Sequence, residues 1–317
     1  METVPVEYAI EIEGLTKRFG RVPALSDLSF KIPRGVIAGF VGPNGCGKTT
    51  TMRILATLLK PEAGVAKVFG SSVDNPATLS MVRHQIGFMP DYFGLYSDMT
   101  AGEYLEFFAA AYRIEADKRP GLVKDMLALV NLSDRKDSLI SGLSRGMQQK
   151  LSLGRALVHS PQLLLLDEPA SGLDPRARIE LMELLRELKR MGKTIFISSH
   201  ILGELGNLCD MVVILEKGHA VYTGSLADAS DGLMQGFRFL ELDVATDPDV
   251  AAEVVKALAG VRSIRRTESL LMIEHLPSLS SADIIEACVK RGIRVNEAKL
   301  GSANLEEIFM HMTGKGA

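Results

Sequence analysis

Four residues, Gly42, Gly47, Lys48 and Thr49, match the spacing G-x-x-x-x-G-K-[ST] directly after an apolar segment that ends at Val41. Glycines here let backbone N–H groups turn towards an anion, and the helix that follows adds further unpaired N–H groups. The lysine can reach the outer phosphates of a nucleotide, and the threonine hydroxyl can bind Mg²⁺. A strand–turn–helix connection that needs glycines only for its geometry is the alternative. The strand before and the helix after favour phosphate binding.

We therefore predict that the whole loop contacts a nucleotide, with Lys48 also acting in catalysis. The predicted binding residues of this loop are Gly42, Pro43, Asn44, Gly45, Cys46, Gly47, Lys48, Thr49 and Thr50. The side chain of Cys46 is expected to be neutral in function. A reactive thiol is the alternative, because the loop is electropositive and positive charge favours the thiolate.

Two acids, Asp167 and Glu168, follow the run of leucines from Leu163 to Leu166. A run that is apolar at every position is typical of a central parallel strand, buried on both faces. An acid at the end of such a strand, near a phosphate-binding loop, predicts that Asp167 is a Mg²⁺ ligand, directly or through water. Glu168 is then placed to polarise an attacking water as a general base. Without the upstream loop, two solvent-facing acids at a strand end would be an equal interpretation.

The segments that must position these residues alternate between strand and helix patterns, which predicts an α/β fold with a mainly parallel sheet. Asp174 and Pro175 are N-cap and first-turn signals for a helix that Gly192 closes. Further strands are predicted at residues 9–12, 24–32, 35–41, 86–89, 194–199, 211–215 and 220–222.

A helical insertion is expected at about residues 91–158. Thr100 and Glu103 form a capping-box pattern before an aromatic-rich helix that reaches Tyr112, and a second helix is predicted at 121–130. Ser144 can cap a third helix that runs to about Val158. This stretch interrupts the strand–helix alternation of the core.

A second, smaller domain is predicted after a linker at about 225–236. Residues 237–298 follow the order β-α-β-β-α-β, which suggests a ferredoxin-like α+β domain, and Asn304 would cap a last helix. We predict domains at 1–232 and 233–317.

Composition excludes several classes of protein. The chain has 317 residues, 46% of them hydrophobic, and a net charge of −3, so it has no global attraction for nucleic acid. Its cysteines, Cys46, Cys209 and Cys288, form no C-x-x-C pair, which argues against a zinc site and for a reducing compartment. No apolar stretch is long enough to span a membrane, and the N-terminal residues do not resemble a signal peptide. We expect a protein of the cytoplasm that reaches a membrane only through a partner.

Three further motifs resemble those of the ATP-binding cassette (ABC) ATPases. The segment Leu143-Ser144-Arg145-Gly146-Met147-Gln148-Gln149-Lys150 is similar to the ABC signature, and Ser171-Gly172-Leu173-Asp174 is similar to the D-loop. His200, after the strand that follows, is similar to the switch histidine. The resemblance covers about residues 8–224, with five motifs in order.

The resemblance implies a P-loop NTPase nucleotide-binding domain with an N-terminal antiparallel β subdomain. It also implies two copies arranged head to tail with two ATP molecules between them. Each ATP would contact the loop of one copy and Ser144 and Gly146 of the other, because the N–H groups that begin a helix bind anions. His200 would orient the γ-phosphate and act in catalysis. Asp174 would contact the nucleotide site, although it is equally well a helix cap.

Phe19 matches the family's adenine-stacking aromatic residue; core packing in the N-terminal sheet is the alternative. Two positions depart from the family pattern. Asp91 stands where the family usually has a glutamine that contacts Mg²⁺. Aspartate is also a metal ligand, so we predict that Asp91 can contact Mg²⁺. Arg145 and Met147 replace the usual glycine and glutamine of the signature.

Three classes of function compete. The first is the ATPase subunit of a transporter, which would need a separate permease and would lie at the cytoplasmic face of the membrane. The second is a soluble ABC protein that acts on ribosomes or DNA, and the third is a regulatory nucleotide-binding module. A single P-loop, without coiled coils or zinc ligands, favours the first. The segment from Met89 to Phe93, the signature variant and the C-terminal domain resemble cassettes that pair with ABC-2-type permeases, which predicts export.

Overall fold

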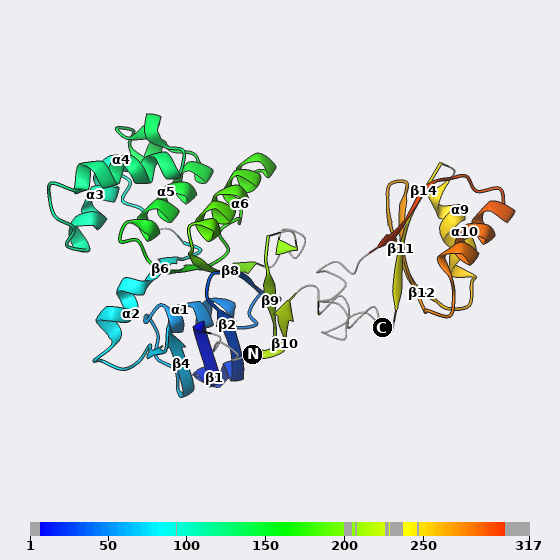
Figure 1. Cartoon of the computed structure of the whole chain (residues 1–317), viewed down its shortest axis with the longest axis horizontal. Coiled ribbons are helices and arrows are strands. Elements are labelled where there is room, and N and C mark those ends of the chain that lie inside the picture. The colour runs from blue at the N-terminus through cyan, green and yellow to red at the C-terminus, as the bar shows by residue number, and fades with distance from the viewer. Residues whose placement is uncertain are drawn as a thin grey trace, which may run out of the picture. The chain divides into compact units, whose positions relative to one another are not determined.

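The computed structural model describes residues 7–92, 94–199, 205–206, 208–225, 228, 237–245 and 247–301. The chain divides into two compact units, Met1–Gly224 and Ser225–Ala317 (Figure 1). The domain boundary predicted at residue 232 lies outside the described residues. None of the described helices is both long and apolar enough to cross a membrane.

The first unit begins with an antiparallel sheet. It contains β1 (Tyr8–Phe19), β2 (Val22–Pro33), β4 (Ala63–Val68) and β5 (Ser71–Ser72), in the order β2-β1-β4-β5. Alternate side chains of β1 and β2 face a core that includes Ile10, Ile12 and Phe30, as period-two patterning requires. β1 and β2 contain strands predicted from their alternating pattern, whereas β4 was not predicted, because its first three residues are exposed and carry no such pattern.

The second sheet of this unit has six strands in the order β10-β9-β3-β8-β7-β6. Its pairs β3–β8, β3–β9, β7–β8 and β6–β7 are parallel. β7 and β8 are buried at every position, which explains the uninterrupted run of leucines in β7 and the apolar centre Ile195-Phe196-Ile197 of β8. The strands are β3 (Ile37–Val41), β6 (Ile86–Met89), β7 (Leu163–Leu166), β8 (Thr194–Ser199), β9 (Met211–Glu216) and β10 (His219–Ser225).

The helices of the insertion form a separate core. In Figure 1 they gather at one end of this unit, with β1, β2 and β4 at the other end. The predicted capping box is present: Thr100 Oγ1 accepts from the Glu103 N–H at 3.2 Å, and Glu103 Oε2 accepts from the Thr100 N–H at 2.8 Å. Tyr104, Leu127 and Leu151 are buried together in this core. The insertion contains α3 (Ala101–Ala111), α4 (Arg119–Leu129) and α5 (Arg145–Leu157).

The described part of the first unit contains further α-helices outside the insertion. They are α1 (Lys48–Leu55), α2 (Leu79–Gln85) and α6 (Pro175–Arg190). Gly192 follows α6 with a positive φ of 82°, as its predicted closing role requires. The short helix α2 was not anticipated, because of its seven residues only Val82 is buried and no apolar stripe marks it.

The second unit has the predicted order of elements. Its sheet order β12-β13-β11-β14, with every neighbouring pair antiparallel, is that of a ferredoxin-like domain. One face of the sheet packs on α9 and α10 through residues such as Leu242, Val255 and Ile284. The helix predicted after Asn304 lies outside the described residues. The elements are β11 (Arg238–Val244), α9 (Pro248–Lys256), β12 (Val261–Thr267), β13 (Leu270–His275), α10 (Ser281–Lys290) and β14 (Val295–Gly301).

Candidate functional site

The loop between β3 and α1 has no room for a side chain at two of its positions, Gly42 and Gly47. A Cβ on Gly42 would lie 2.3 Å from the Leu215 carbonyl oxygen. Gly47 has a φ of 113°, and a Cβ there would lie 2.6 Å from the Ala24 carbonyl oxygen. Both clashes involve backbone atoms, which cannot move aside without disturbing the sheet. The loop is therefore packed tightly on neighbouring strands while its tip stays exposed.

The loop borders a cavity of about 370 Å³. Most of the nucleotide contacts predicted from the loop line it, and Asp91, Glu168 and Ser171 join them from other parts of the chain. The lining residues are Ala24, Asn44, Gly45, Gly47, Lys48, Thr49, Thr50, Asp91, Glu168 and Ser171. The predicted loop and two of the predicted acids thus meet at one cavity.

Lys48 is the cation of this cavity, and only 6% of its surface is exposed. Its Nζ donates to the carbonyl oxygens of Gly42 at 2.6 Å and Pro43 at 3.3 Å, and lies 3.6 Å from Glu168 Oε1. The loop folds back around its own lysine, which fixes the ammonium group at the cavity wall. A fixed, poorly hydrated cation is suited to phosphate oxygens.

The two acids are joined through Ser198. Asp167, 1% exposed, accepts at Oδ1 from Ser198 Oγ at 2.7 Å. The same Oγ accepts from the Glu168 N–H at 2.9 Å. Ser198 was not among the predicted site residues. The signal that could have found it is a polar residue after the apolar positions Ile195, Phe196 and Ile197 of a buried strand.

The predicted Mg²⁺ ligands have a donor set that fits the ion. Asp167 Oδ2 is buried and accepts no hydrogen bond from the described residues, so it offers a lone pair to a cation, although Asp167 is not among the residues that line the cavity. Thr49 and Asp91 line the cavity with oxygen-bearing side chains. Among the described residues no group of three His, Cys, Asp or Glu side chains could hold a metal. Mg²⁺ commonly takes one or two carboxylates together with substrate phosphates and water, so the residues present are sufficient.

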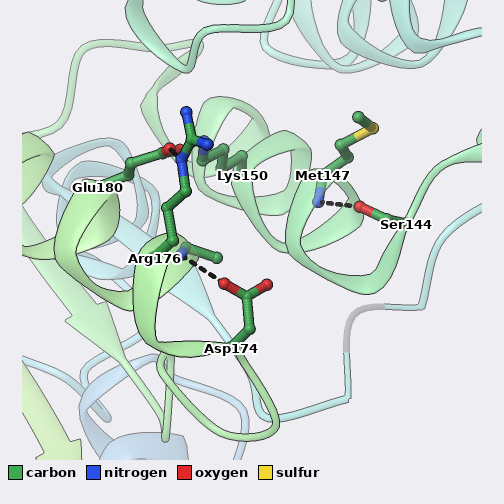
Figure 2. A network of polar contacts seen from close by, with 7 residues as sticks. Ser144, Met147, Lys150, Asp174, Arg176 and Glu180 are labelled. Atoms are coloured by element: carbon green, nitrogen blue, oxygen red, sulfur yellow. Dashed lines mark hydrogen bonds and ion pairs between the residues drawn. The ribbon is translucent and has the colours of Figure 1, made fainter.

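The signature residues do not reach this cavity. Ser144 is the N-cap of α5, where its Oγ accepts from the Met147 N–H at 3.4 Å. Asp174 is the N-cap of α6, where Oδ1 accepts from the Ala177 N–H at 3.0 Å. Figure 2 shows the two helix ends beside each other, with Glu180 of α6 paired with both Lys150 and Arg176. Of the described residues that line the cavity, none is Ser144, Gly146 or Asp174.

Arg145, which stands where the family usually has glycine, lies over the loop before α6. A Cβ on Gly172 would lie 2.8 Å from its Cζ. Gly172 has a φ of 71°, a left-handed conformation that favours glycine. A Cβ on Gly146 would lie 3.4 Å from Leu173 Cδ2, which shows how closely α5 approaches this loop.

The structure also bears on the predictions for Phe19 and Cys46. Phe19 is 53% exposed, so the alternative of core packing is wrong, although Phe19 is not among the residues that line the cavity. Cys46 is buried, and that burial raises the pKa of its thiol despite the nearby Lys48 ammonium. The alternative of a reactive thiol is therefore not supported, because attack requires the thiolate. The predicted switch residue His200 lies outside the described residues.

Comparison with known proteins identifies the family. The family described as "ABC transporter" matches residues 25–171. The chain is 34% identical over 311 residues to the Nod factor export ATP-binding protein I of Burkholderia lata, covering 96% of this chain and 97% of that protein. The chain belongs to the ABC transporter ATP-binding proteins. The chain is also 30% identical to the bacitracin transport ATP-binding protein BcrA of Enterococcus faecalis, over 98% of each protein.

Solved structures agree with this ABC assignment. An ATP-binding subunit of an ABC transporter superimposes with a TM-score of 0.64 at 30% identity, over 71% of this chain and 93% of that one. A dimeric, post-hydrolysis ATP-binding cassette bound to ADP and Pi has a TM-score of 0.63 at 26% identity, over 68% of this chain and 98% of that one. The protein is thus an ABC ATPase with a nucleotide-binding domain.

Proposed function

We propose that this ABC ATPase hydrolyses Mg²⁺-ATP between two head-to-tail copies and powers export through a separate ABC-2-type permease. The observation that carries the proposal is the separation of the two halves of the site. The loop, Asp91 and Glu168 border one cavity, whereas Ser144 at the start of α5 does not line it. A second copy would supply its Ser144 and Gly146 to the nucleotide held by the first.

We assign each step of hydrolysis to residues at the cavity or at the predicted site positions beyond it. The ammonium group of Lys48 and the backbone N–H groups of residues 44–49 bind and orient the phosphates. Glu168 accepts a proton from the attacking water as general base. Asp167, Thr49 and Asp91 would hold Mg²⁺, which when bound offsets phosphate charge. His200 is proposed to orient the γ-phosphate, and Phe19 to stack on the adenine.

A second cavity supports a permease partner. It has a volume of about 1110 Å³ and is lined by residues of α1, α2, α3 and α5, among them Arg53, Phe108 and Tyr112. The Arg155 guanidinium lies 5.4 Å from the centre of the Phe108 ring and donates to the Phe88 carbonyl at 2.9 Å. Aromatic rings and arginines are the side chains enriched in protein interfaces. We propose that a cytoplasmic segment of the permease binds here, which would hold the protein at the membrane surface.

The direction of transport is inferred from relatives. The two relatives above are named for Nod factor export and bacitracin transport, and a third, 32% identical over 96% of each protein, is the daunorubicin resistance ATP-binding protein DrrA3 of Streptomyces coeruleorubidus. These names favour an exporter. A ribosome- or DNA-acting ATPase and a regulatory nucleotide-binding module remain the alternatives to be tested.

Glu168→Gln tests the hydrolytic site, because glutamine keeps the shape of the side chain and removes the base. We expect ATP affinity to be kept, turnover to fall below about one hundredth of wild type, and an ATP-dependent dimer to persist in light scattering. Glu183→Gln, an exposed acid of α6, is the matched control and should behave as wild type. Unchanged turnover in Glu168→Gln would rule out this residue as the base, and a monomer in ATP would contradict the shared site.

Purification of the full chain from native membranes tests the partner. Recovery of a multi-span membrane protein, lost when Tyr112 is changed to Glu in the larger cavity, would support the permease. Recovery of ribosomes or DNA in its place would favour the alternative.

A further inference from the structure

We propose that Ser198 is a positioning residue that couples the general base Glu168 to the metal-binding carboxylate of Asp167. This inference rests on the proposed function, because it assigns a role in the hydrolysis that Glu168 performs. Ser198 belongs to β8 and does not line the nucleotide cavity, so it would act through Asp167 and Glu168.

The strand order gives Ser198 its place. The phosphate-binding loop leaves β3 and the acids leave β7, and β8 lies between these strands. In the parallel register, Phe40 of β3 is level with Ser198, and Leu166 of β7 is level with Ile197. Ser198 is thus one step beyond the last paired residue of β7, beside the acids. Ser198 is therefore placed to contact both acids from the neighbouring strand.

The Ser198 hydroxyl uses both of its hydrogen-bonding functions on the two acids. It is fully buried and has one proton, which it donates to Asp167 Oδ1 at 2.7 Å. Its oxygen then accepts the N–H of Glu168 at 2.9 Å. A hydroxyl polarised by a carboxylate is a stronger acceptor, so the two bonds reinforce each other. The Asp167 bond also leaves Oδ2 as the oxygen available to a cation.

Glu168 needs such support because its backbone is strained. Its φ is 49°, in the left-handed region that a residue with a large side chain rarely occupies. The Ser198 bond at its N–H and the Ser171 N–H at its carbonyl oxygen, 3.0 Å away, hold this conformation from both sides. The conformation in turn directs the carboxylate to within 3.6 Å of Lys48 Nζ. Without Ser198, Glu168 would lose one of these two restraints.

The test compares Ser198→Ala and Ser198→Cys with Ser152→Ala in the full-length protein. Ser152 is a matched control, because it is also fully buried but its hydroxyl has no hydrogen-bond partner. For Ser198→Ala we expect kcat to fall about 10–100-fold, the size of effect seen when a partner of a metal-binding carboxylate is removed. Affinity for ATP without Mg²⁺ should change less than about twofold, since Lys48 and the loop are intact. Ser198→Cys keeps the volume with a weaker donor and should lie between wild type and alanine.

Amide hydrogen exchange of the nucleotide-free protein gives a second readout, independent of turnover. The Glu168 N–H should exchange faster in Ser198→Ala than in wild type, while amides of β3 and α1 stay unchanged. A double variant separates positioning from general destabilisation. In a Glu168→Gln background, the added Ser198→Ala change should lower the residual single-turnover rate by a smaller factor than it lowers the rate of the wild type, because one of the two groups it positions is already disabled.

The outcomes distinguish the two proposals. Wild-type protein without ATPase activity would overturn the proposed function and the role of Ser198 with it. Active wild-type protein with unaltered kcat in Ser198→Ala would overturn the positioning role alone. Equal losses of turnover in Ser198→Ala and Ser152→Ala would also overturn it, since they would reflect a less stable core rather than a misplaced base.

Discussion

The Lys48 ammonium lies 3.6 Å from the Glu168 carboxylate, although β8 separates the strands that lead to these two residues. Lys48 begins the helix after β3, and Glu168 follows β7. Both side chains are largely buried, so their attraction is less screened than that of a surface pair. The proposed phosphate-binding cation and the proposed base therefore hold each other at one wall of the cavity.

Removing the Lys48 ammonium should weaken nucleotide binding. We expect Lys48→Ala to lower ATP affinity about 10–100-fold, because a charge-assisted hydrogen bond to phosphate contributes about 1.5–3 kcal/mol. Titration with a fluorescent ATP analogue measures the change. Lys31→Ala is the control, since Lys31 lies on the surface between Glu11 and Glu13, and it should bind ATP as wild type does. Equal affinities for Lys48→Ala and wild type would contradict the role of this loop.

The exposed Phe19 ring should contribute to binding the base and not the phosphates. Phe19→Ala is expected to weaken ATP binding about two- to tenfold, the equivalent of one aromatic stacking contact. The free energy of unfolding should change little, because the ring is 53% exposed. Inorganic triphosphate, which lacks a base, is the control ligand and should bind both proteins equally. A matching loss of triphosphate affinity would show that Phe19 acts on the loop and not on adenine.

Asp174 has a capping role that can be separated from any role at the nucleotide. Asp174→Ala should lower the free energy of unfolding by about 1 kcal/mol, because the Ala177 N–H loses its acceptor. Asp174→Ser keeps an oxygen at the N-cap and should be nearly as stable as wild type in urea unfolding. ATPase activity is then measured on the serine variant. Normal stability with reduced turnover would reveal a second role, whereas normal turnover would leave capping as the only one.

His159 should make stability depend on pH. Its ring stacks on Tyr112 at 3.8 Å between centres, and Nε2 donates to the Ile86 carbonyl at 2.9 Å. Burial lowers the pKa of His159 from 6.5 to about 4, with smaller contributions from His84 and Lys193. A proton on the ring would also place a donor at Nδ1, which is buried without a partner.

Because the folded pKa lies below the unfolded value, the unfolded chain takes up the proton first as pH falls. The contribution of His159 is complete above about pH 6.5 and is lost as pH falls towards 4. We expect a loss on the order of 1–2 kcal/mol, given the partial exposure of the ring. Urea unfolding at pH 7 and pH 5 measures it. His159→Phe keeps the stacked ring without a titrating group and should show a smaller drop; parallel pH curves would contradict this prediction.

Local patterns in the chain were sufficient for most of the fold. The run from Leu163 to Leu166 is a strand buried on both faces, and Thr100 with Glu103 forms the capping box that begins α3. Elements with weak patterns were missed: β4 exposes its first residues, and α2 buries only Val82. Amphipathic patterning reveals an element only when it buries a consistent face, so short elements at the surface leave little signal.

The sequence by itself determined which residues could bind phosphate, metal and water, because those functions depend on residue type and on spacing within one turn. Gly42, Lys48, Asp167 and Glu168 were identified in that way. Only the tertiary structure decided that β8 lies between the two strands, that Ser198 joins both acids, and that Ser144 does not line the cavity. These relationships arise from the order of strands in a sheet and from the packing of helices on it. Contacts between residues far apart along the chain leave no mark in local periodicity or spacing.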